Sequence, residues 1–113
     1  MAKFECHMTA NASRLANYLD SGIMNSALSV ELVDSAVQQI GDVTVWLYMY
    51  DKYYMRNSSR AALTVQIIGT KNDANVTAIS AGGGTGTFFS FSYGAEENFV
   101  GVVEKLIDQY TEA

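Results

Sequence analysis

The sequence predicts an α+β fold: a two-layer sandwich in the order β-α-β(about 5)-α, with an antiparallel sheet and two helices packed on one face. Segments with helical periodicity lie near both ends, and alternating segments separated by short polar turns lie between them. The 113 residues are 49% apolar and 17% charged, a composition typical of a globular chain. We therefore expect residues 1–113 to form a single domain.

The first strand and the first helix follow from a change in periodicity. Residues 3–9, KFECHMT, alternate between apolar and polar side chains, which predicts a half-buried strand. Residues 10–22 have the spacing of a helix with one apolar stripe. We expect Thr9 or Asn11 to cap the start of this helix, and Gly22 to follow its end.

The middle of the chain alternates repeatedly, which predicts consecutive strands joined as an antiparallel meander. We expect these strands at residues 26–34, 43–56, 60–70, 75–80 and 87–93. By the same alternation, the inward side chains of the first and third of them are Leu28, Val30, Leu32, Leu63, Val65 and Ile67.

The last element is a helix over residues 95–110. Its apolar residues recur at the 3.6-residue spacing of one helix face: Phe99, Val102, Val103, Leu106, Ile107 and Tyr110. Gly101 is unfavourable inside a helix, so it marks either a close backbone approach or a neutral substitution.

The long strand at 43–56 carries most of the large aromatic side chains. We expect Val43, Val45, Leu47 and Met49 to face the helices, which leaves the alternate residues on an uncovered face. The binding or interface candidates on that face are Trp46, Tyr48, Tyr50, Tyr54, Ile68 and Phe88. Such a face is typical of a contact between copies, of plain surface, or of a groove for a ligand or partner. A shift of one residue would turn the aromatic side chains towards the helices.

The glycine-rich stretch at residues 80–87, SAGGGTGT, resembles the phosphate-binding loop of tubulin and the bacterial division GTPases. That loop needs a following helix, whose first N–H groups bind the phosphate. Here the alternating residues FFSFSY follow, which indicates a strand. We therefore expect a flexible connection or a bulge, and no phosphate site, at Gly82, Gly83, Gly84 and Gly86.

No set of catalytic or metal-binding residues stands out in the sequence. Cys6 and His7 are neighbours in a strand, so their side chains point to opposite faces and cannot form a dyad. One histidine and one cysteine cannot complete a zinc site. We therefore expect no metal and no cofactor, and an enzyme is the least favoured class.

Charge and hydropathy exclude several kinds of partner. The net charge is −5 with no cluster of basic residues, so we expect no nucleic-acid partner. The apolar run VTVWLYMY is much shorter than the ~20 residues that a membrane helix needs. The N-terminal residues lack the apolar core of a signal peptide, and the single cysteine suits a reducing compartment. We expect a cytoplasmic protein.

Four stretches resemble a family of small bacterial proteins known only as a domain of unknown function: MAKFE, IGDV at 40–43, SAGGG, and FFSFSYGAEENFV. The resemblance implies a bacterial, cytoplasmic setting and no activity or catalytic residue. On the residues alone, we expect a non-catalytic interaction module that forms a homodimer through its aromatic sheet face. The alternative is a small-molecule-binding protein, with a pocket between sheet and helices or on that face.

Overall fold

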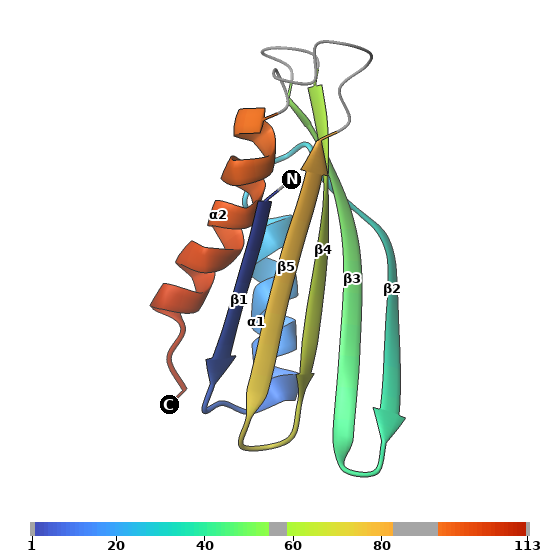
Figure 1. Ribbon diagram of the computed structural model, residues 1–113, viewed down its shortest axis with the longest axis vertical. Coiled ribbons are helices and arrows are strands. Elements are labelled where there is room, and N and C mark those ends of the chain that lie inside the picture. Colours follow the sequence, from blue (N-terminus) through green and yellow to red (C-terminus); the bar gives the residue numbers. More distant parts are fainter. Residues whose placement is uncertain (1, 55–58, 83–92, 113) are drawn as a thin grey trace.

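The computed structural model describes residues 2–54, 59–82 and 93–112, and it confirms the predicted α+β sandwich with an antiparallel sheet and two helices (Figure 1). The elements are β1 (Ala2–Met8), α1 (Ala12–Met24), β2 (Val30–Ile40), β3 (Val43–Tyr54), β4 (Ser59–Gly69), β5 (Ala74–Gly82) and α2 (Tyr93–Gln109). The strand expected at 87–93 lies outside the described residues, apart from Tyr93, which begins α2.

The five strands form one antiparallel sheet in the order β1-β5-β4-β3-β2. Strands β2 to β5 correspond to the first four strands of the predicted meander, and β1 pairs with β5 at the far side. The β2–β3 hairpin turns at Gly41, whose φ of 63° suits glycine. Strand β2 is shifted along the chain from the prediction. It begins at Val30, so Leu28 precedes it and is fully exposed rather than inward.

Both helices lie on one side of the sheet (Figure 1): α2 packs against β1, β5 and β4, and α1 packs against β4, β3 and the edge strand β2. The buried core lies between the two layers. Its largest fully buried side chains are Tyr50, Phe99, Leu15, Leu19, Ile23, Leu63, Ile67, Val65, Val76 and Val103. The predicted inward positions on β4 and the apolar stripe of α1 are therefore correct.

Asn11 caps α1 as predicted, since its side-chain oxygen accepts a hydrogen bond from the Arg14 N–H. The expected end at Gly22 is wrong, because α1 continues to Met24. Gly22 instead lies against α2, where an added Cβ would come within 2.6 Å of a Leu106 methyl carbon. Gly101 has nothing within 4 Å of such a Cβ, so of its two predicted alternatives the close backbone approach is wrong.

The predicted orientation of β3 is wrong. Trp46 pairs with Ile67 and Tyr50 with Leu63, and paired residues of neighbouring strands share a face. Since Ile67 and Leu63 face the helices, the aromatic residues of β3 face them too. Tyr50 is 0% exposed, and the other three β3 candidates are partly buried against the core: Trp46, Tyr48 and Tyr54. The side chains on the uncovered face include Leu47 and Met49, which are exposed.

The remaining sequence-predicted positions are divided between the two faces and the undescribed segments. Ile68 lies on the uncovered face, opposite to Trp46, because its neighbour Ile67 faces the helices. Gly82 is the last residue of β5. Phe88, Gly83, Gly84 and Gly86 lie outside the described residues.

Candidate functional site

A groove of about 680 Å³ lies at the end of the sheet where the β2–β3 turn, the β4–β5 turn and the start of α1 come together. Its size is in the range of small-molecule sites. The lining residues are mostly polar: Asn11, Ser13, Gln39, Asp42, Thr44, Trp46, Gly69, Thr70, Lys71 and Asn72. Among the sequence candidates that the structure describes, only Trp46 lines this groove.

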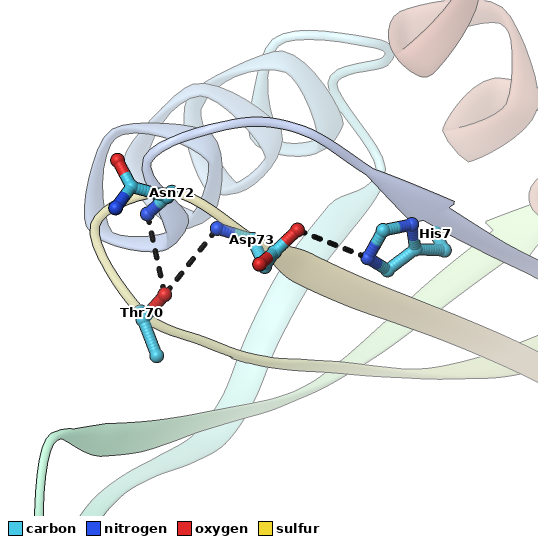
Figure 2. Close-up of polar contacts among 4 residues, drawn as sticks. All are labelled: His7, Thr70, Asn72 and Asp73. Carbon is cyan, nitrogen blue, oxygen red and sulfur yellow. Dashed lines mark hydrogen bonds and ion pairs between the residues drawn. The ribbon is translucent and has the colours of Figure 1, made fainter.

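The β4–β5 turn forms one wall of the groove, and its own hydrogen bonds fix its shape. The Thr70 N–H donates to the Asp73 carbonyl oxygen at 2.8 Å. The Thr70 hydroxyl oxygen accepts from the N–H groups of Asn72 and Asp73, at 3.2 and 3.3 Å (Figure 2). A threonine that accepts from the amides two and three residues later is a common device of tight turns.

Two backbone hydrogen bonds fasten this turn to the segment that leads into α1. The Ala10 N–H donates to the Asn72 carbonyl at 3.1 Å, and the Ala12 N–H donates to the Thr70 carbonyl at 2.9 Å. Because Asn11 caps the Arg14 N–H, the first turn of α1 has few N–H groups left to offer. The two walls of the groove are therefore joined, and the helix start is not an open anion site.

Gly69 allows the helix to approach the sheet at this point. A Cβ at position 69 would collide with the Asp73 carbonyl oxygen and would lie 2.8 Å from the Ala12 Cβ. Even an alanine therefore cannot fit without moving the turn or the helix. The absence of a side chain here sets the geometry of both walls.

Trp46 supplies the one large aromatic surface among the described residues of the groove. It lies on β3 between Val37 of β2 and Ile67 of β4, and it is half-buried against the core. Around it stand the side chains of Ser13, Asp42 and Thr44, which have no hydrogen-bond partner in the part of the chain that the structure describes. The groove thus combines an aromatic surface with free polar groups.

His7 and Asp73 lie next to the groove on the other side of the β4–β5 turn. His7 Nε2 is 3.2 Å from Asp73 Oδ1, and the two side chains are 60% and 63% exposed (Figure 2). Ion pairs this exposed contribute little to stability. Cys6 packs on the opposite face of β1, against the core, so the predicted separation of Cys6 and His7 is confirmed.

The other aromatic candidates of β3 belong to the core contacts. The Tyr50 hydroxyl donates to Asp20 Oδ1 at 2.6 Å, and the Tyr48 ring stacks on Tyr50 with centroids 6.1 Å apart. Burial is the main cause that raises the pKa of Tyr50 far above its usual value, and the Asp20 carboxylate adds to it. Burial also raises the pKa of Tyr54 to about 12. These tyrosines hold the sheet against α1 and α2.

Sequence reasoning missed most of the groove. Asn11, Ser13 and the turn 70–72 come from separate parts of the chain, and each reads as an ordinary cap or turn. Trp46 was the only signal available. Among the described residues, no three His, Cys, Asp or Glu side chains are grouped to hold a metal ion. Within that same part of the chain, no helix has the length and hydropathy to cross a membrane.

Comparison with known proteins identifies a family. No curated protein matches the chain. The crystal structure of TTHA0849 from Thermus thermophilus is similar at 11% identity, covering 97% of this chain and 99% of that one, with a TM-score of 0.32. Residues 1–111 match the family of unknown function DUF6054, and the chain belongs to that family.

Proposed function

We propose that the protein is a non-catalytic interaction module that self-associates through the edge strand β2, with a second copy of the chain as its partner. One observation carries the proposal. All ten residues from Glu31 to Ile40 are exposed, including Val37 at 62% and Ile40 at 82%. Within the described residues, β2 pairs only with β3, so its other side offers unpaired N–H and C=O groups.

The two edge strands of the sheet, β1 and β2, differ in how well they are protected from pairing with a strand of another chain. Strand β1 is short, packs against α2, and carries Lys3, Glu5 and His7 on its outer face. Strand β2 is longer, contacts α1 but is exposed from Glu31 onward, and contains no lysine, arginine or proline. Proteins commonly prevent edge-to-edge pairing with short strands, lysine, proline or a covering element. In its described part, β2 has only the irregularity between Leu32 and Asp34 and the acidic Glu31 and Asp34 to discourage such pairing, whereas β1 is short, carries Lys3 and packs against α2.

A two-fold axis through Val37 gives a self-complementary pairing of residues 34–40. In that register, Val37 lies opposite Val37 of the second copy, and Asp34 lies opposite Ile40. The two Asp34 carboxylates therefore do not face each other. The paired segment follows the irregularity between Leu32 and Asp34, so it is regular throughout. Such an isologous interface closes as a dimer and leaves no further edge at β2.

The proposal predicts a concentration-dependent dimer in light scattering after size exclusion. Val37→Lys should shift the protein to the monomer, because the two added charges would face each other across the axis. Asn75→Lys is the matched control, since it adds the same charge on the exposed outer face of β5. A wild-type monomer at millimolar concentration, or equal behaviour of the two variants, would contradict the proposal.

We further propose that the protein works in the bacterial cytoplasm. The support is Cys6, the single cysteine, which is a free thiol half-buried against the core. A lone thiol without a disulfide suits a reducing compartment. Fractionation of cells that carry the native gene tests this setting, and recovery in a secreted fraction would contradict it.

A further inference from the structure

We propose that the groove around Trp46 is a binding site for a short neutral saccharide. This inference does not depend on self-association. It is based on the kinds of side chain that line the groove, on their free hydrogen-bonding capacity, and on the rigidity of the walls.

The lining matches the two kinds of surface that a sugar presents. A pyranose ring has an apolar face of C–H groups, surrounded by hydroxyls that both donate and accept hydrogen bonds. Trp46 offers a flat apolar surface to the first. The hydroxyls and carboxylate of Ser13, Thr44 and Asp42, which are free of partners within the described residues, suit the second.

The same lining disfavours other ligand classes. Lys71 and Asp42 are the only charged residues in the described lining of the groove, and their charges balance, so an anion has no net attraction. The N–H groups of Ala12 and Arg14, at the start of α1, are already used by Thr70 and Asn11. A fatty acid or another apolar ligand would have to bury polar side chains without partners, which is costly.

The walls are held in place before any ligand binds. The bonds from Ala10 to Asn72 and from Ala12 to Thr70 join the helix start to the turn. The close approach at Gly69 leaves little freedom between them. A preformed groove has less ordering entropy to lose on binding, which favours weak but specific recognition of a small polar molecule.

Trp46 is the single tryptophan, so it reports on its own site. We would titrate the ¹⁵N-labelled full chain with glucose, galactose, N-acetylglucosamine and maltose up to their solubility limits. The expected result is a saturable shift of the Trp46 indole N–H and of the Lys71 and Asn72 amides with at least one sugar. No shift with any of these sugars would overturn the proposal.

Two variants test the chemistry of the site. Thr44→Val removes a groove hydroxyl at nearly constant shape, and we expect it to weaken binding about tenfold. Thr77→Val makes the same change on the outer face of β5, outside the groove, and should leave the affinity unchanged. Equal affinity for both variants would contradict a role for Thr44 in the site.

Sodium phosphate and sodium laurate provide the competing arms of the titration. Saturable shifts of the same signals with phosphate but with no sugar would identify an anion site. The same result with laurate alone would identify an apolar site. Either outcome would overturn the saccharide assignment. Neither would bear on dimer formation through β2, which is tested separately by light scattering of the wild type and Val37→Lys.

Discussion

Tyr50 donates a 2.6 Å hydrogen bond to Asp20, and this contact joins the middle of β3 to α1 beneath a fully buried ring. Tyr50→Phe should lower the free energy of unfolding by about 1.5–3 kcal/mol, the usual contribution of a hydrogen bond to a charged group. Urea unfolding followed by circular dichroism measures the change. Tyr53→Phe is the matched control, because Tyr53 lies on the exposed face of the same strand and should change stability very little.

The same tyrosine makes the fold sensitive to alkali. Its pKa is raised above that of the unfolded chain, so the stabilisation is complete below about pH 10 and is lost as the pH rises further. Above about pH 10 the unfolded chain loses the Tyr50 proton while the folded chain keeps it. Each further pH unit should therefore lower the free energy of unfolding by about 1.4 kcal/mol. Tyr54 adds to the slope, since its folded pKa is raised to about 12. Unfolding curves at several alkaline pH values should show a smaller slope for Tyr50→Phe, and an unchanged slope would exclude Tyr50 as a source.

Gly69 and Gly101 should respond in opposite directions to the same substitution. Gly69→Ala places a methyl group against the Asp73 carbonyl and Ala12, and should cost about 1–3 kcal/mol. Gly101→Ala meets open space inside α2 and should stabilise the protein by about 0.5–1 kcal/mol. Thermal unfolding of both variants tests the pair. Stabilisation by Gly69→Ala would show that the turn and the helix are not held together.

Thr70 should matter more to the β4–β5 turn than the nearby ion pair does. Thr70→Val removes the acceptor of two amides and should cost about 1 kcal/mol, whereas Thr70→Ser keeps the hydroxyl and should behave as wild type. His7→Gln breaks the exposed pair with Asp73 and should change stability by less than about 0.5 kcal/mol. The urea midpoints of the three variants rank their losses of stability. A larger loss for His7→Gln than for Thr70→Val would contradict the prediction.

The architecture could be predicted from the sequence, whereas the direction of β3 could not. Alternation shows that Trp46 and Tyr50 share a face, but it does not say which face the helices cover. The register of the β3–β4 pair decides the orientation of β3. Trp46 pairs with Ile67, and the alternation of β4 predicts that Ile67 faces inward. Leu47 and Met49 have the hydropathy of core residues and lie outside because neither described helix covers that face of β3.

The groove around Trp46 could not be predicted from the sequence for a different reason. Two of its walls are the capping segment at Asn11 and the turn at Thr70, which are far apart in the sequence and are joined only by tertiary hydrogen bonds between the start of α1 and the β4–β5 turn. Each segment satisfies a local rule, as a cap or as a turn. Only the tertiary arrangement places both of them beside Trp46.

The strand order also has a consequence for synthesis on the ribosome. Strand β1 is synthesised first, but its partner β5 ends about seventy residues later. Strand β1 therefore cannot pair until most of the chain has been synthesised. The hairpin of β2 and β3 needs only its own short turn and can close much earlier. The exposed edge of β2 is therefore present before β4, β5 and β1 complete the sheet. On the proposed pairing through β2, two neighbouring nascent chains on one messenger RNA would pair before either sheet is complete.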